Sequence, residues 1–375
     1  MKMKKVLAGM MMCLAMVSCI QDEALNVEAA IDGCRGKDIQ QCLIDPNAFT
    51  IQLYVSKAAD LSKINLLFEL PAGATVAPEQ KLQTDGTDTY NFEENKMRKF
   101  KVTSEDGAFS ATYEVRLWQT EMPTAYGFEM LSSLTPYHVF YEEKDEGHIL
   151  RRLEWSSGNP GYKLTAQAKT PLDYPTVQVN GGINGGKCVK LETKDTGSFG
   201  SMVKMYIAAG NLFIGSFEVG QALNDAMKAT RFGFPYFYRP QSLKGHYKYK
   251  AGPQFSVKGE IVEGKKDQCD IYGVLYETDD NVHFLDGSNS LTSENIVALA
   301  RNIDQLPETD DWKEFNFDFE LKKGKSIDSE KLKKGIYKLA IVFSSSVDGA
   351  KFEGAVGSTL YVDQVEIVNY PDSNN

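Results

Sequence analysis

The sequence has no run of basic residues of the kind by which nucleic-acid-binding proteins are recognised. Lysine and arginine total 41 against 51 aspartates and glutamates, which gives a formal net charge of −10. Because binding to a phosphate backbone depends on basic surfaces, we expect no nucleic-acid partner. The remaining composition, with 42% hydrophobic and 25% charged residues over 375 positions, is that of a globular chain long enough for two domains.

Common catalytic motifs are also missing. No G-x-S-x-G, H-E-x-x-H or P-loop occurs, and the four histidines do not have the spacing of metal ligands. The glycines of "GGINGGKC" have neither the G-x-G-x-x-G spacing nor a following helix, which argues against a phosphate cradle. A pair of catalytic carboxylates remains open, because the sequence offers many acidic residues and gives no distance between them.

No apolar run near the N-terminus is long enough to span a bilayer. Lys2, Lys4 and Lys5 precede an apolar segment from Val6 to Val17. A basic start followed by a short apolar segment is typical of a secretory signal peptide rather than of a membrane-spanning helix. We therefore expect an exported protein.

Ser18-Cys19, directly after that apolar segment, resembles the lipobox of bacterial lipoproteins, with Met16 where leucine is usual. The resemblance implies a signal peptide over residues 1–18, lipidation of Cys19, and an anchor linker over residues 19–27. The following "IQDE" is similar to the acidic tag that directs many Bacteroidetes lipoproteins to the outer cell surface, which implies an outer-membrane location. The protein would then contact the membrane through its lipid anchor alone. The alternative is an ordinary cleaved signal with a chance cysteine.

The cysteines give no C-x-x-C motif, and so no support for a zinc or thioredoxin-type site. Cys34 and Cys42 bracket the polar loop "RGKDIQQ", and in an oxidising compartment they form either a disulfide or two free thiols. Cys188 and Cys269 lie in strand-like runs, where we expect them to serve as small buried hydrophobic residues.

Strand-like runs dominate the chain and predict an all-β fold. Segments such as "FTIQLYVS", "ATYEVRLW" and "IYKLAIVFSSS" are rich in β-branched and aromatic residues and are bounded by Gly, Pro, Asp and Asn. The clearest helical candidate is "SLTSENIVALARNID", residues 290–304, which fits a strand with a loop equally well.

A domain boundary is predicted near Pro123, because the preceding segment closes with a hairpin around Gly107 and a new β pattern begins after it. With "FELPAGATVAPE", this hairpin makes residues 28–120 resemble the small immunoglobulin-like domains found at the N-terminus of Bacteroidetes surface lipoproteins. The resemblance implies an Ig-like β-sandwich that acts as a spacer.

Residues 124–370 carry a combination of phrases that points to one family. Among them are "GFEM", "LEWSSGNPG", "AAGNLFIGSF", "RFGFPYFYRPQSLKGHYKYKAG", "CDIYGVLYE" and "AIVFSSSVDGAKFEGAVGSTLYVDQVEI". Together they resemble the putative carbohydrate metabolism domain of Bacteroidetes lipoproteins. The resemblance implies a larger jelly-roll β-sandwich, similar to carbohydrate-binding modules.

The stretch "RFGFPYFYRP" is the most aromatic in the chain. In a continuous strand, Phe232, Phe234, Tyr236 and Tyr238 share one face, which we expect to be mostly core. The opposite face, with Arg231, Phe237 and Arg239, would then be turned outward.

A sugar-binding site needs flat rings for the C–H faces of the sugar and planar groups for its hydroxyls. Six residues supply these types and form the predicted glycan site, although the sequence does not show whether they converge: Trp155, Tyr162, Tyr236, Tyr238, Arg239 and Trp312. Trp312 lies on the polar face of its strand, which favours a ligand contact. Trp155, next to a turn, fits either the rim of a site or a packing role.

Many jelly-roll carbohydrate modules hold a structural calcium between an acidic residue of the first strand and one of the last. Glu129 and Asp363 occupy the matching places, so the resemblance implies a calcium clip there. The alternative is a surface glutamate and an aspartate that accepts backbone hydrogen bonds.

Three functions compete at this point. The leading hypothesis is a non-catalytic, lipid-anchored surface protein that binds a glycan or polysaccharide, with the first domain as a spacer. The second is an adhesive or structural surface protein. The third is a glycan-active hydrolase that uses a carboxylate pair.

Overall fold

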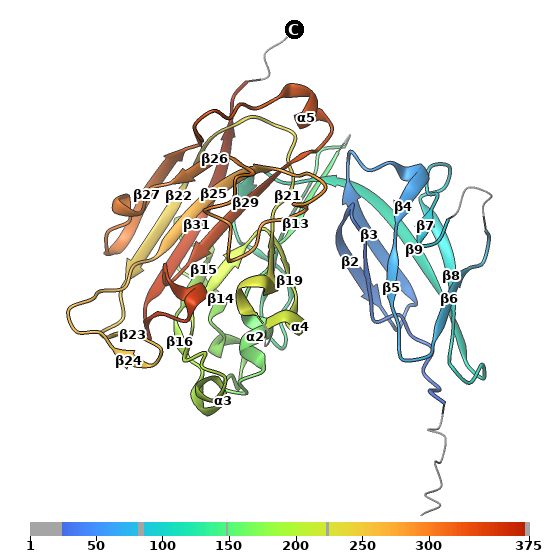
Figure 1. The fold of residues 1–375 in the computed structure, drawn as a ribbon, viewed down its shortest axis with the longest axis horizontal. Coiled ribbons are helices and arrows are strands. Elements are labelled where there is room, and N and C mark those ends of the chain that lie inside the picture. The colour runs from blue at the N-terminus through green and yellow to red at the C-terminus, as the bar shows by residue number, and fades with distance from the viewer. Residues whose placement is uncertain (1–24, 82–85, 148, 223–224, 372–375) are drawn as a thin grey trace, which may run out of the picture.

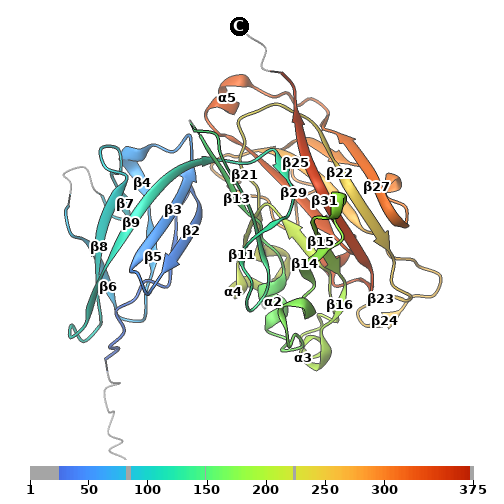
Figure 2. The same cartoon turned by 180° about the vertical axis from the view of Figure 1, so that it is seen from behind.

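The protein is almost entirely β, as its sequence predicts (Figures 1 and 2). The computed structural model describes residues 25–81, 86–147, 149–222 and 225–371. The predicted signal peptide and Cys19 lie outside these residues. Within them, no helix is long and apolar enough to cross a membrane.

The N-terminal β body surrounds a core of its own, which includes Ile51, Leu53, Phe100, Tyr113 and Val115. Its strands are β1 Gly33–Arg35, β2 Ile39–Asp45, β3 Thr50–Ser56, β4 Ile64–Asn65, β5 Leu67–Glu69, β6 Thr75–Pro78, β7 Thr89–Tyr90, β8 Met97–Thr103 and β9 Ser110–Glu121. A disulfide joins Cys34 in β1 to Cys42 in β2, the first of the two alternatives that the sequence left open.

Strand β9 continues from this body to the second. Its last residues pair in parallel with β13 (Leu150–Glu154), so that Thr120 lies opposite Leu150 and Glu121 opposite Arg151. This pairing extends one sheet across both bodies in the order β11-β12-β13-β9-β3-β2, with β11 at Met130–Ser133 and β12 at Val139–Asp145. Met122, at the predicted boundary, is buried in the core of the second body. The two bodies are therefore joined by backbone pairing as well as by the chain.

The second body is a sandwich of two sheets. The first has the order β14-β15-β31-β22-β27, with β14 Thr176–Asn180, β15 Lys187–Glu192, β31 Thr359–Asn369, β22 Pro240–Lys250 and β27 Thr309–Asp318; β10 Ala125–Tyr126 also pairs with β31. The second has the order β18-β29-β25-β26-β28, with β18 Asn211–Phe213, β29 Tyr337–Ser344, β25 Asp270–Glu277, β26 Ile296–Arg301 and β28 Glu320–Leu321. One core fills the space between them, with Leu243 and Val362 from the first sheet against Ile271 and Ile341 from the second.

The outer face of the second sheet is also apolar, because β25 and β29 are buried on both faces. Phe213, Tyr272, Val274 and Val342 form part of a separate cluster there. Short segments lie against this face, among them α2 Asn159–Lys163, α3 Gly197–Met202 and α4 Val219–Ala222, with the 3-10 turns η4 Ala226–Ala229 and η6 Gly349–Lys351. Figure 2 shows α2, α3 and α4 gathered at one end of the sandwich. The remaining helix, α5, spans Ser329–Lys333, and the remaining strands are β16 Lys194–Asp195, β17 Ile207–Ala208, β19 Gly215–Phe217, β20 Thr230–Phe232, β21 Phe234–Pro235, β23 Phe255–Val257, β24 Glu260–Ile261 and β30 Gly354–Ala355.

The structure decides two local predictions, one for the segment 290–304 and one for the aromatic stretch "RFGFPYFYRP". The segment 290–304 forms strand β26 with flanking turns, which is the strand alternative rather than the helix. The aromatic stretch is not one continuous strand, because β20 pairs with β19 while β21 pairs with β29. The break falls at Gly233, whose φ is 91° and whose Cα lies so close to the Tyr276 ring that an added Cβ would be 2.9 Å from it. Glycine tolerates both constraints, so the chain can change sheets there.

Candidate functional site

A pocket of the described chain lies on the outer face of the second sheet. It has a volume of about 260 Å³ and is bounded by residues of β18, β25 and β29 on one side and of α2, α3, η4 and η6 on the other. Leu164 and Ala350 also line it and are exposed, so the pocket reaches the surface. The lining residues come from three parts of the chain that are distant in sequence: 158–222 with 226–232, 270–291, and 342–352.

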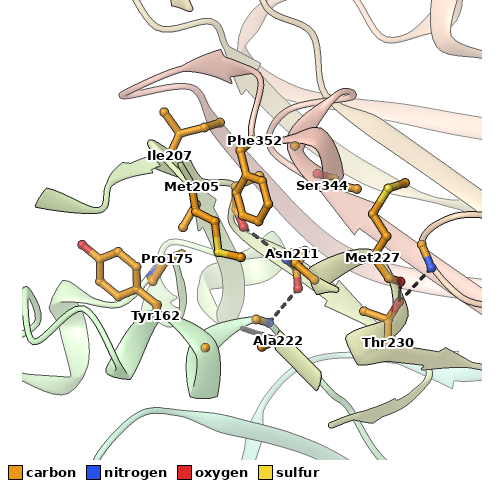
Figure 3. Close-up of a pocket in the computed structure, with 18 of the residues that line it drawn as sticks. Tyr162, Pro175, Met205, Ile207, Asn211, Ala222, Met227, Thr230, Ser344 and Phe352 are labelled. Carbon is orange, nitrogen blue, oxygen red and sulfur yellow. Dashed lines mark hydrogen bonds between the residues drawn. The ribbon is translucent and has the colours of Figure 1, made fainter. Parts of the chain in front are cut away.

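Aromatic and sulfur-containing side chains make up much of the wall. Phe213 and Phe232 meet edge to face with ring centroids 5.0 Å apart, and Tyr162, Met205, Met227 and Phe352 also line the space. Figure 3 labels Asn211 between Met205 and Met227, below Phe352. Aromatic walls favour another ring, and methionine adapts its shape to what it contacts.

A few neutral polar groups interrupt this wall. Asn211 is held by two hydrogen bonds, since its Oδ1 accepts from Gly158 N at 2.8 Å and its Nδ2 donates to Ala209 O at 3.2 Å (Figure 3). Tyr272 Oη and Ser290 Oγ lie 3.1 Å apart and share one hydrogen bond. An amide and two hydroxyls that retain spare hydrogen-bonding capacity can orient an uncharged polar group of a ligand.

Among the described lining residues, Asp270 is the only carboxylate, and Arg301 neutralises it. The Arg301 Nε and Nη2 atoms donate to Asp270 at 2.9 Å in a bidentate pair. Burial raises the pKa of Asp270, and the hydrogen bonds and charge of Arg301 oppose that rise. No lysine, arginine or histidine belongs to the described lining. The pocket wall is therefore close to neutral.

Trp155 is a core residue in the structure. Its side chain is 2% exposed, and its ring centroid lies 5.0 Å from that of Tyr126 and 5.5 Å from that of Phe128. The packing role, one of its two predicted alternatives, describes this position. Of the six residues predicted to bind glycan, only Tyr162 lines the pocket.

Tyr236 and Tyr238 lie away from the pocket, near the junction of the two bodies. Tyr236 is buried and donates through its hydroxyl to Asn369 Oδ1 at 2.7 Å, while Tyr238 donates to Glu121 Oε2 at 2.6 Å. Phe237, predicted to face outward, instead lies beneath Lys57 of the N-terminal body, with the Nζ atom 4.3 Å from the ring centroid. Phe237 and Tyr238 therefore contact the N-terminal body, whereas Tyr236 packs within the second body.

Arg239 and Trp312 are the predicted residues that remain accessible, but they do not meet each other in a site. Arg239 is exposed and its guanidinium lies 4.8 Å from the centroid of the Tyr370 ring. Trp312 is partly exposed in β27, where its Nε1 donates to Gly181 O at 3.2 Å and Lys248 Nζ lies 5.0 Å from its centroid. The six predicted residues are thus distributed over the pocket, the core, the junction and separate surfaces.

Glu129 and Asp363 both face the glycine-rich loop that precedes β15. Asp363 is buried and accepts from Ile183 N at 2.6 Å through Oδ2 and from Gln364 N at 2.7 Å through Oδ1, while Glu129 Oε1 accepts from Lys187 N at 3.0 Å. Among the residues that the structure describes, no three His, Cys, Asp or Glu side chains converge as a metal-binding group. Backbone N–H groups already bind both oxygens of Asp363 and Oε1 of Glu129, so a calcium ion would have to compete with them.

Sequence reasoning missed most of the pocket. The "CDIYGVLYE" strand did carry one signal, because Asp270 stands at the head of a run that reads as buried on both faces, and a buried charge requires a partner. Met205, Met227 and Phe352 lie outside the strands, and Phe213 and Phe232 end strands of only three residues, so no periodicity in the sequence identifies them.

Comparisons with known proteins place the chain in a family. Residues 127–368 match the family model described as "Putative carbohydrate metabolism domain". A solved structure described as a putative glycoside hydrolase from Bacteroides thetaiotaomicron is 42% identical, with a TM-score of 0.76, and the match covers 94% of this chain and 100% of that one. A second, described as a putative glycoside hydrolase from Bacteroides vulgatus, is 44% identical, with a TM-score of 0.63, and covers 67% of this chain and 100% of that one. No curated protein matches. The chain belongs to the putative carbohydrate metabolism domain family.

Proposed function

We propose that this member of the carbohydrate metabolism domain family binds a glycan at the pocket on the outer face of the second sheet, without hydrolysing it. The family match supports a carbohydrate-related role. The observation that carries the proposal is the pocket itself, a ring-lined hollow with Asn211 and the Tyr272–Ser290 pair as neutral polar groups. Rings with a few fixed polar groups are the usual composition of a small-molecule site.

The single carboxylate among the described lining residues argues against hydrolysis in the pocket. Glycoside hydrolysis by the common mechanisms needs two carboxyl groups roughly 5 to 10 Å apart, one of them free to donate a proton. Asp270 is the only carboxylate among the described lining residues, so the lining supplies no second carboxyl group, and both oxygens of Asp270 already accept hydrogen bonds from Arg301. Glycan binding does not require a pair of carboxyl groups, so the described lining suits binding better than hydrolysis.

A glycan-active hydrolase is the second candidate, because both solved relatives are described as putative glycoside hydrolases. The two candidates separate in one experiment. The soluble chain from Asn26 is applied to a glycan array, and every glycan that binds is then incubated with the protein and analysed for new reducing ends. Binding without cleavage supports the proposal. Cleavage that persists in Asp270→Asn would place a catalytic pair elsewhere in the chain.

We also propose that Cys19 anchors the protein at the cell surface. The sequence order of basic residues, apolar run, Ser18 and Cys19 supports this. Cys19→Ala should move the protein from the membrane fraction to the soluble fraction after lysis. Unchanged retention in the membrane fraction would contradict lipidation.

A further inference from the structure

The chemistry of the pocket is unusual for a site that takes a bare sugar ring. A pyranose carries hydroxyls around its edge, and burying a hydroxyl without a partner costs about 1–3 kcal/mol in proteins. The wall offers phenylalanine, methionine and aliphatic side chains over most of its extent, with polar groups at only a few points. A whole sugar inserted here would leave several hydroxyls without hydrogen bonds.

We propose that the pocket receives an aromatic ester substituent carried by the glycan, while the sugar chain itself stays at the mouth. This inference rests on the proposed glycan-binding function and specifies what enters the site. The Phe213 and Phe232 rings, already packed edge to face, would contact the inserted ring, and Met205 and Met227 would adjust around it. The ester or ring hydroxyl would reach Asn211 or the Tyr272–Ser290 pair.

The charge of the site selects an ester over the free acid. No cationic side chain belongs to the described lining, and Asp270 keeps its own counter-ion in Arg301. A ligand carboxylate would lose its water without gaining a positive partner, which is strongly unfavourable in a mostly apolar site. A neutral ester does not meet this penalty.

The size of the pocket agrees with a single ring and a short chain. An apolar cavity of about 150 Å³ is enough to bind benzene. A volume of about 260 Å³ leaves room for further heavy atoms beyond one ring. This matches a phenylpropanoid ester group better than a long acyl chain.

Calorimetric titration with three probes tests the inference on the soluble chain from Asn26. We expect methyl 4-hydroxycinnamate to bind, and free 4-hydroxycinnamate and methyl β-glucoside to bind at least about tenfold more weakly. Equal affinity for the ester and the free acid, or a preference for the glucoside, would overturn the proposal.

Two variants locate the binding. Ala226→Phe places a ring into the pocket from η4 and should weaken ester binding at least about tenfold, whereas Lys228→Phe adds the same ring on the exposed side of that turn and should leave it unchanged. Met227→Ala removes a flexible wall residue and should weaken binding about threefold, which provides a reading if Ala226→Phe fails to fold. If neither Ala226→Phe nor Met227→Ala weakens ester binding, the ester does not bind at this pocket.

The outcomes also separate this inference from the proposed function. Ester binding that Ala226→Phe weakens, together with no glycan bound on the array, would support an aromatic ester as the ligand of the pocket and would refute glycan binding. Glycan binding on the array, together with no ester binding, would keep the proposed function and refute the aromatic substituent.

Discussion

Glu121 is predicted to hold the two β bodies together. It ends strand β9 and is 1% exposed, yet it is a charged residue at the point where the chain passes between the bodies. Its carboxylate accepts from Arg151 Nη1 at 3.0 Å and from Tyr238 Oη at 2.6 Å, and it pairs with Lys57 Nζ. Residues from both bodies therefore share one buried acceptor.

Removal of the Glu121 carboxylate should lower the free energy of unfolding because Arg151 and Lys57 lose a buried partner. Breaking a buried ion pair by deleting one partner costs about 3–5 kcal/mol, because the other charge stays buried without compensation. The Arg151 side chain is only 16% exposed, but it keeps a second partner in Glu146 at 3.1 Å, and Lys57 can reach water. We therefore expect Glu121→Ala to lower the free energy of unfolding by about 3 kcal/mol, the lower end of that range.

Urea unfolding of the soluble chain, followed by tryptophan fluorescence, measures this loss, and Glu146→Ala is the matched control. Glu146 contacts the same guanidinium but is 27% exposed, so its removal should cost far less stability than removal of Glu121. Because each body has its own core, Glu121→Ala should also separate one transition into two. If the two variants lose equal stability, the buried network does not join the bodies.

Three further predictions concern single residues. Trp155→Ala should cost about 3–5 kcal/mol in urea unfolding and Trp312→Ala less than about 1, because only the first ring fills the core; the reverse order would contradict this assignment. Burial raises the pKa of Glu142 to about 7 from 4.5, so the folded state holds its proton more tightly and stability should fall as pH rises between those values. Glu142→Gln should remove much of that fall, measured as unfolding midpoints at pH 5 and pH 8, and equal pH profiles for the two proteins would count against it. Chelator should leave the melting temperature unchanged, because backbone N–H groups already bind Glu129 and Asp363; a decrease that calcium reverses would restore the calcium hypothesis.

Local periodicity was sufficient to predict the class of the fold and the burial of some strands. In β27, Phe315 and Phe317 are buried while Trp312 remains partly exposed, as the alternation of polar and apolar residues predicts. The same reasoning was wrong where it assumed one continuous strand, from Arg231 to Arg239. A period of two holds only while the chain stays in one sheet, and at Gly233 it changes sheets.

The site could not be predicted in the same way, because convergence depends on topology rather than on residue type. Trp155 and Tyr236 have suitable rings for a sugar, but packing places both in the core. Phe213 and Phe352 are more than a hundred residues apart in the sequence. They line one pocket with Met227 because β18 is an edge strand of the second sheet, while η4 and the end of η6 lie against the outer face of that sheet. No spacing rule connects segments whose proximity comes from strand pairing.

The second sheet separates the pocket on its outer face from the core between the two sheets. Val342 and Phe343 are neighbours in β29, yet they belong to separate clusters, one outside the sheet and one between the sheets. The inner cluster closes the sandwich without help from α2, α3, η4 or η6, so those segments are free to shape the outer face. Irregular segments tolerate changes in sequence and length better than paired strands do. Under the proposed function, a change of ligand would require changes in this cover and would leave the inner core intact, so variants at Ala226 and Met227 are expected to alter binding more than stability.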